Sequence, residues 1–315
     1  MRQEVNHGRH IRVALAVVLL AITAPAAVEA VDSPEAPASA VASASIPALT
    51  VRPALELGFV DVPHHTLQFG EDTDRFDYVT QGGQEILFPF QRLRIDVGIG
   101  ERQRHHVSLL YQPLTFETVT QMEEPLTIDD ETFTTGQVVD LVYGFDFWRG
   151  SYVYRFVDRT PWEVDAGISF QIRNASIRFQ AQGGDPTDSE PSQNELVVSQ
   201  DTGPVPVLRA RSRYTFVSGY WLEAEADGFY ASNAFINGAD YPFTGWIWDA
   251  AVSAGARIHA MTEAYLTVRT IGGGAEGTST DPRGTWTQSV AGGDERYTSN
   301  SIATVAITAG FRLLF

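Results

Sequence analysis

The sequence has no cysteine and no lysine among its 315 residues. Without cysteine, the chain has no disulfide bond, no thiolate metal site, no cysteine nucleophile and no cysteine that could carry a lipid anchor. All 22 basic residues are arginines, and with 39 acidic residues the formal net charge is -17 at pH 7. Nucleic-acid binding needs basic surfaces that neutralise phosphates, so nucleic acid is not an expected partner.

Long apolar runs are also scarce, and the clearest one lies close to the N-terminus. It covers residues 13–23 and is shorter than the ~20 residues that a membrane-spanning helix needs. Arginines precede this run, and residues 28–30 offer small side chains for cleavage, so residues 1–30 are predicted to be a secretory signal peptide. Residues 31–50 are rich in Ala, Ser and Pro and are predicted to be a flexible periplasmic segment before one domain at 51–315.

From residue 51 onward, apolar and polar residues repeatedly alternate with a period of two. Residues 92–99 alternate between charged or small side chains and aliphatic ones, and residues 163–173 do the same. Such alternation predicts β-strands whose two faces meet different environments. An aliphatic face and a charged face fit either a soluble barrel with an apolar interior or a transmembrane barrel with lipid outside, and the topology distinguishes the two.

The connections between the predicted strands alternate between tight and long. Tight turns are predicted near residues 100–104, 158–161, 217–219 and 260–262, and long polar connections near 64–84, 121–135, 182–195, 233–242 and 278–297. Outer-membrane barrels have tight turns at the periplasmic end and long loops at the outer end. The sequence therefore predicts an all-β fold, an antiparallel up-and-down transmembrane β-barrel of about ten strands.

The fourth predicted strand, around residues 145–155, combines two conflicting phases. Its aromatic residues form two sets of opposite phase, 143, 145 and 147 against 152, 154 and 156. A β-bulge near Arg149 and Gly150 would reconcile the two phases. A real turn at the same place would instead give twelve strands.

Charge alone predicts the register of one hairpin. Three arginines alternate on one strand and three acidic residues on the next, namely Arg209, Arg211 and Arg213 against Asp227, Glu225 and Glu223. A three-residue turn at 217–219 would place them opposite one another in that order, on the face turned into the barrel. In a later hairpin, a turn at 260–262 predicts His259 opposite Glu263 and Ser253 opposite Arg269.

Further inward-facing charges follow from the same alternation. The predicted lumen network consists of Arg92, Arg94, Asp96, Asp165, Arg173, Arg209, Arg211, Arg213, Glu223, Glu225 and Asp227, with Asp140, Asp146, Arg155, Asp249, Arg257 and Arg269 as further members. Barrels of this size enclose little more room than side chains fill. A lumen filled by salt bridges predicts a structural or surface-interaction protein, and a narrow pore for small solutes is the alternative.

A surface hydrolase of the lipid A or protease type is a further alternative. His64 and His65 beside Asp61 could form a dyad of the kind that omptin proteases use. No second acidic pair stands at a matching position, so an ordinary loop base is favoured and no catalytic residue is assigned. The histidines and serine within 105–108 are predicted at the periplasmic mouth, far from lipid A in the outer leaflet.

The last eight residues, 308–315, form a strand pattern that ends on an aromatic residue. Gly310, Leu313 and Phe315 match the β-signal of bacterial outer-membrane proteins, which this C-terminus resembles. The resemblance implies export through the periplasm, recognition by the barrel-assembly machinery and a final location in the bacterial outer membrane. The rest of the chain resembles no characterised functional family.

Acidic residues concentrate in the predicted long connections. The densest group is Glu123, Glu124, Asp129, Asp130 and Glu131. Its oxygen ligands would suit Ca²⁺ or Mg²⁺, but the spacing matches no calcium-loop motif, so solvated loops are favoured and no other cofactor is predicted. The expected partners of the folded chain, predicted to be a monomer, are outer-membrane lipid and lipopolysaccharide.

Overall fold

The computed structural model describes residues 49–70, 73–128, 131–182, 195–232, 243–279 and 296–315. The predicted signal peptide and nearly all of the predicted flexible segment lie outside the described residues, although residues 49 and 50 belong to the first strand. All the regular secondary structure of the described residues is β-strand. None of these residues form a helix that is long and apolar enough to cross a membrane.

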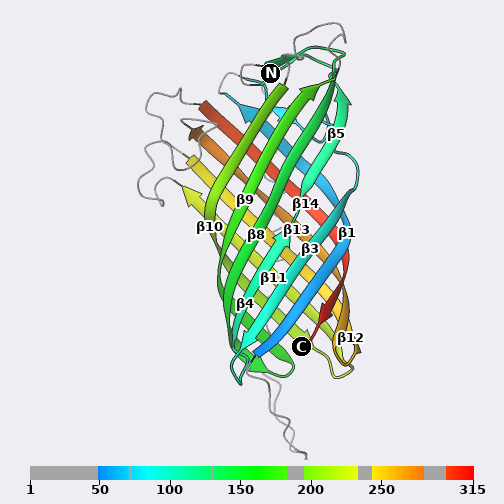
Figure 1. Ribbon diagram of the computed structural model, residues 1–315, viewed down its shortest axis with the longest axis vertical. Helices are drawn as coiled ribbons and strands as arrows, with labels where there is room; N and C mark the ends of the chain where they lie inside the picture. Colours follow the sequence, from blue (N-terminus) through cyan, green and yellow to red (C-terminus); the bar gives the residue numbers. More distant parts are fainter. Residues whose placement is uncertain (1–48, 71–72, 129–130, 183–194, 233–242, 280–295) are drawn as a thin grey trace, which may run out of the picture.

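The strands form one closed antiparallel barrel (Figure 1). They are β1 (Leu49–Phe69), β3 (Phe88–Ile99), β4 (His105–Gln112), β5 (Thr115–Gln121), β8 (Val138–Arg159), β9 (Trp162–Ala181), β10 (Glu195–Thr215), β11 (Tyr220–Ser232), β12 (Phe243–His259), β13 (Thr262–Ser279) and β14 (Arg296–Leu313). Pairing of β1 with β14, from Ala54 opposite Arg312 to Phe69 opposite Thr298, closes the wall. Because β4 and β5 both pair with β8 and continue one another across Pro113, the wall has ten strand positions. The predicted all-β barrel of about ten strands is confirmed.

Tight turns join the strands at one end of the barrel, the tight-turn end, and longer segments join them at the other, the long-loop end (Figure 1). Gly100 and Gly219 take φ angles of 85° and 84° in two of the tight turns, which glycine adopts without steric cost. In the β10–β11 hairpin the predicted register is confirmed, with Arg209 opposite Asp227 and Arg213 opposite Glu223.

The register predicted for the β12–β13 hairpin is wrong. Arg257 rather than His259 lies opposite Glu263, because the pairing shifts between Arg257 and His259. Ser253 consequently faces Thr267. An irregularity of this kind leaves the alternation of side chains on either strand almost unchanged, so the residue pattern alone did not reveal it.

The apolar face of the wall changes sides midway between the two ends. On β3, Phe88 and Phe90 are buried inside the barrel near the long-loop end, and the next inward residue is Arg92. On the outer face of the same strand Gln91 is exposed, and the next outward residue is Leu93. The half near the tight turns thus has an apolar outside and a charged inside, whereas the half near the long loops is arranged like a water-soluble barrel.

Aliphatic and aromatic side chains cover the outside of the tight-turn half. They include Leu55, Leu57, Phe59, Leu93, Ile95, Leu109, Ile168, Phe170, Ile172, Leu266, Val268 and Ile307, all of them exposed. On β12, Trp246 and Trp248 face outward and pack over Gly274 and Gly272 of β13, where a Cβ atom would collide with the indole rings. Tryptophans of this kind mark the edge of an apolar belt at a membrane interface.

The conflicting phases of the fourth predicted strand have a structural cause. The pairing of β8 with β9 is regular from Val139 to Arg155, so the bulge predicted near Arg149 and Gly150 is wrong, as is the alternative turn. The aromatic residues at 143, 145 and 147 point inward in the long-loop half, and those at 152, 154 and 156 point outward in the tight-turn half. One uninterrupted strand carries both phases because the apolar face changes sides between them.

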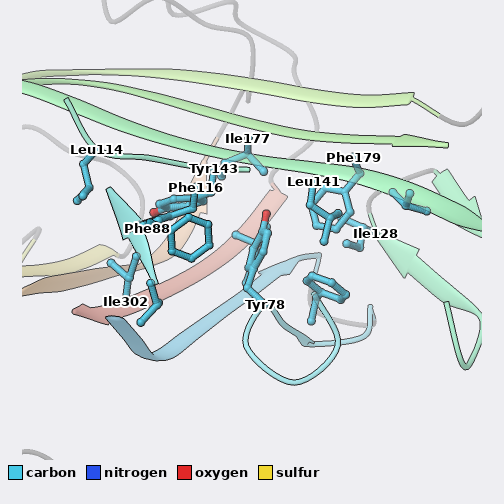
Figure 2. Packing of buried hydrophobic residues seen from close by; sticks show 14 of the residues in the cluster. Tyr78, Phe88, Leu114, Phe116, Ile128, Leu141, Tyr143, Ile177, Phe179 and Ile302 are labelled. Atoms are coloured by element: carbon cyan, nitrogen blue, oxygen red, sulfur yellow. The ribbon is translucent and has the colours of Figure 1, made fainter. Parts of the chain in front are cut away.

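A cluster of buried hydrophobic residues, the aromatic cluster, fills the long-loop half (Figure 2). The wall supplies members such as Phe88, Phe90, Phe116, Leu141, Tyr143, Ile177 and Phe179. The connection after β1, which includes β2 (Phe76–Asp77), folds inward and adds Phe76 and Tyr78, while the hairpin of β6 (Leu126–Ile128) and β7 (Glu131–Phe133) adds Leu126, Ile128 and Phe133. The connections predicted as polar at 64–84 and 121–135 therefore also contribute to a hydrophobic core.

Candidate functional site

The inner face of the tight-turn half carries the charged lumen. Every residue of the predicted network lies on this face, namely Arg92, Arg94, Asp96, Asp165, Arg173, Arg209, Arg211, Arg213, Glu223, Glu225 and Asp227. Asp249, Arg155 and Arg269 are also buried inside. Two further predictions are wrong, because Asp140 and Asp146 alternate with inward residues of β8 and lie on its outer face. Arg257 is exposed at the tight-turn end.

Four buried charges of the lumen were missed by the sequence interpretation: Glu56, Arg149, Glu263 and Arg312. Their strand phases could have revealed three of them, since each follows the alternation of an inward face. Arg149 was concealed by the bulge predicted at its own position.

Asp249 is the centre of the first group of ion pairs. Its carboxylate accepts hydrogen bonds from Arg92 at 3.2 Å, Arg149 at 3.0 Å and Arg269 at 2.5 Å. Arg149 also donates to Asp227 at 2.5 Å. All of these side chains are at most 1% exposed. These buried arginines and aspartates neutralise one another's charge, so the loss of one member affects all the others and the group behaves as one cooperative unit.

Glu225 holds a second group in the same layer. It accepts hydrogen bonds from Arg94 at 2.5 Å and Arg209 at 3.0 Å, and Arg269 lies at 3.4 Å. Arg269 therefore joins the Glu225 and Asp249 groups across the lumen. The residues of the two groups come from β3, β8, β10, β11, β12 and β13, so the network ties opposite walls of the barrel together.

Nearer the tight-turn end, Glu263 and Glu223 bind two more arginines. Arg312 donates to Glu223 at 2.9 Å and to Glu263 at 3.3 Å, and Arg213 donates to Glu263 at 2.7 Å. The Arg213 guanidinium also lies 4.2 Å from the ring centre of buried Trp221, a cation–π contact. These contacts link β10, β11, β13 and β14.

Arg211 binds only one of the two acidic residues that lie opposite it. It lies opposite Glu225 in the β10–β11 ladder and opposite Asp165 in the β9–β10 ladder, and its guanidinium donates through Nε and Nη2 to Asp165. Arg155 donates to the other oxygen of Asp165 at 2.9 Å. Glu225 already has three arginines within ion-pair distance. The expected pair of Arg211 with Glu225 is therefore wrong.

A double-mutant cycle between Arg211→Gln and Asp165→Asn is expected to show a coupling energy of about 1–3 kcal/mol, because the two groups share a buried hydrogen-bonded ion pair. The matched cycle between Arg211→Gln and Glu225→Gln should stay below about 0.5 kcal/mol. Denaturant unfolding in detergent micelles gives all the required free energies. Stronger coupling to Glu225 than to Asp165 would contradict the contacts seen here.

Arg173 differs from the other lumen arginines. No carboxylate among the described residues lies within ion-pair distance of it, and its guanidinium lies 4.8 Å from the ring centre of Phe145. It stands at the boundary between the charged lumen and the aromatic cluster, where an aromatic ring compensates part of its charge.

His64 and His65, which the sequence suggested could act together with Asp61, lie on opposite faces of the wall. Asp61 and His64 are exposed on the outside, whereas His65 is fully buried in the aromatic cluster. The His65 ring is stacked on Tyr78 at 4.1 Å between ring centres, and its Nδ1 lies 2.8 Å from Oε1 of Gln84. Burial lowers the pKa of His65 to about 3, so the ring is neutral at ordinary pH. Without a carboxylate partner, His65 is a packing residue rather than a general base.

Lowering the pH from 7 to 5 is expected to weaken the long-loop half by about 2 kcal/mol through His65. Its pKa is about 3 in the folded protein and 6.5 in an unperturbed chain. Between these values the unfolded chain binds a proton that the folded protein does not, so stability falls as the pH falls through 6.5. Unfolding measured against pH should lose this component in His65→Gln and keep it in His64→Gln. An unchanged pH dependence in His65→Gln would refute the assignment.

The remaining predicted residues lie away from the lumen network. Glu123 and Glu124 are exposed, Glu131 begins β7, and Asp129 and Asp130 lie outside the described residues. In the part of the chain that is described, no group of three or more His, Asp or Glu residues is arranged to hold a metal ion.

The C-terminal strand residues of the predicted assembly signal have distinct positions. Gly310 faces inward beneath the ring of Tyr265, which leaves no room for a Cβ atom. Leu313 and Phe315 are exposed on the outside, in line with the apolar belt. The backbone of Phe315 exchanges two hydrogen bonds of 3.0 Å with Val51, so the last residue extends the closure of the barrel.

The closed ten-position wall, with its apolar outside and charged inside, defines the class of the protein as a β-barrel of the outer-membrane type. The outer membrane protease OmpT from Escherichia coli aligns with a TM-score of 0.41 and 10% identity, over 84% of this chain and 97% of that chain. A FadL homologue from Pseudomonas aeruginosa aligns with a TM-score of 0.31 and 10% identity, over 84% and 89%. No family model and no curated protein matches the chain.

Proposed function

We propose that this protein is an integral outer-membrane β-barrel with a closed lumen and a structural or surface-interaction role. The observation that carries the proposal is that two successive layers of side chains block the interior of the barrel along its axis. The ion-pair network fills the tight-turn half, and the aromatic cluster fills the long-loop half. A solute pore needs a continuous water-filled path, and fully buried Arg92, Arg149 and Asp249 stand across it.

The apolar belt supports insertion of the tight-turn half in a membrane. On β1 the outward apolar residues run from Leu49 to Phe59, and a transmembrane β-strand needs about 9–11 residues. Asp61 and His64 follow on the same outer face and are exposed. The tight turns then belong to the periplasmic side, and the long-loop half projects beyond the outer leaflet.

The projecting half is the part available to surface partners. Its outer face is polar, and its loops carry the acidic residues that the sequence concentrates there, including exposed Glu123 and Glu124. Anionic lipopolysaccharide would approach such loops through bridging divalent cations. The aromatic cluster supports these loops from below, as a rigid core supports binding loops in other proteins.

In planar lipid bilayers the refolded protein is expected to show no discrete conductance steps. Both filling layers act in series, so loosening one of them should leave the barrel closed. Arg149→Ala and replacement of residues 76–85 by a Gly-Ser linker are therefore each expected to stay silent as well. Heat-modified gel mobility would verify that each variant is a folded barrel. Regular steps from the unmodified protein would contradict the closed lumen and support the narrow pore.

A further inference from the structure

The tight-turn end of the lumen contains a group of cationic residues that the rest of the network does not neutralise. Arg155 on β8 and Arg211 on β10 bind buried Asp165, and Arg52 on β1 and His106 on β4 face the same end of the lumen. The electrostatic neighbours of His106 are Arg211, Arg155, Asp165 and Arg52, so these five groups share one site.

The arginines of this site differ in how far they are paired. Arg155 contacts Asp165 and Glu163, each at 2.9 Å, and Arg211 donates to Asp165. For Arg52, no carboxylate among the described residues lies within ion-pair distance, although its side chain is only half-buried and points into the barrel mouth. Arg155 and Arg211 thus share Asp165, and Arg155 also contacts Glu163, whose side chain is 36% exposed. Asp96 lies opposite Arg52 in the β1–β3 ladder, but it is bound by Arg94 at 2.9 Å.

A buried nitrogen in the same place also lacks a partner. His106 is 4% exposed, and among the described residues its Nε2 has no hydrogen-bond partner. Buried polar atoms are nearly always satisfied, so a group left without a protein partner points to a bound water, ion or ligand. This orphan nitrogen is independent of the surplus of arginine charge, and both lie at one site.

The site can be reached from the tight-turn end. The Arg211 side chain is 11% exposed to solvent, and Arg52 is half-buried. Gln103, whose φ of 48° is unusual for a residue other than glycine, tucks its side chain beneath the mouth, where Thr50 donates to its Oε1 at 2.6 Å. Thr50 and Gln103 add neutral polar groups beside the cations.

We propose that Arg52, His106, Arg155 and Arg211 form a binding site for a phosphate-type oxyanion at the tight-turn end of the lumen. The planar guanidinium of arginine presents paired N–H donors that match two oxygens of a phosphate group, and Arg52 has no carboxylate partner among the described residues to compete for these donors. His106 completes the site with Nε2–H as a fourth donor. A free phosphate and the phosphate of a lipid headgroup share this chemistry.

The test uses the full-length mature protein refolded in maltoside micelles, which contain no phosphate. Inorganic phosphate, titrated against sodium chloride at equal ionic strength, is expected to raise the unfolding temperature in a saturable way. Arg52→Gln and His106→Gln should each weaken the apparent affinity by at least about tenfold, the effect of about 1.4 kcal/mol. Arg102→Gln, which changes an exposed arginine of the adjacent turn, should retain the affinity of the unmodified protein.

Short-chain phosphatidylglycerol, added below its critical micelle concentration, distinguishes the source of the ligand. A larger temperature shift with this lipid than with inorganic phosphate identifies a headgroup, and the reverse identifies the free anion; both support the site. The proposal is overturned if neither compound raises the unfolding temperature beyond sodium chloride. It is equally overturned if Arg52→Gln retains the full shift or if Arg102→Gln loses as much affinity as Arg52→Gln.

Discussion

Replacement of Asp249 by asparagine is expected to lower the free energy of unfolding by about 3–5 kcal/mol, because removing one partner leaves buried charges uncompensated. Asp249 lies within ion-pair distance of Arg92, Arg149 and Arg269, and asparagine keeps its shape while removing its charge. Urea unfolding of the protein in micelles, followed by tryptophan fluorescence, measures the loss.

Asp61→Asn is the matched control, because it makes the same chemical change at a residue that is exposed on the outer face. Exposed charges contribute at most about 1 kcal/mol, so the control should unfold almost like the unmodified protein. Similar small losses of unfolding free energy in both variants would mean that water reaches position 249 and screens the arginines left without a partner, as in an open conduit. The closed-lumen proposal would then fail together with the prediction.

Replacement of Phe179 by alanine is expected to cost about 3–5 kcal/mol, the usual range for a large aromatic residue in a packed core. Phe179, labelled with Tyr78 in Figure 2, is 0% exposed, and its ring packs against those of Phe76, Tyr78 and Phe133. The loss should appear in the same urea unfolding measurement and should also make residues 76–85 more accessible to proteases, because Phe179 holds that segment inside the barrel.

Phe170 on the same strand is the matched control, because it faces outward in the tight-turn half and is 52% exposed. Phe170→Ala should cost only about 1.5–3 kcal/mol in micelles, because its ring passes from the micelle into water on unfolding but leaves no cavity in the folded barrel, and it should leave residues 76–85 protected from proteases. Equal protease sensitivity of residues 76–85 in the two variants would contradict the exchange of the apolar face along β9. The comparison therefore tests the architecture of the whole wall with two substitutions nine positions apart.

The sequence predicted much of the wall because the information was local. Alternation over residues 92–99 and 163–173 set the inward and outward faces, and Gly100 and Gly219 marked tight turns that need positive φ. The β10–β11 register followed from three opposite charges on neighbouring strands, since a short hairpin allows few alternatives. Where a bulge interrupted the ladder near Arg257, the same reasoning failed.

The candidate site was less predictable than the wall. The alternation identified which charges face inward, but it did not show that Arg211, opposite Glu225 on one side and Asp165 on the other, binds Asp165. A guanidinium at the end of a long side chain reaches several strands, and its partner depends on which carboxylates other arginines have already satisfied. The orphan nitrogen of His106 and the unpaired guanidinium of Arg52 are likewise properties of the closed barrel alone.

The sequence by itself determined the class of fold, the approximate number of strands and the inward side of most strands in the tight-turn half, because these depend on period-two alternation and turn residues. Only the tertiary structure decided where the apolar face changes sides and which charges pair. Closure brings together residues such as Arg94 and Glu225, 131 positions apart, and packs the segment around Tyr78 against β8 and β9. Contacts at such separations depend on the three-dimensional path of the chain, which no local pattern of residues encodes.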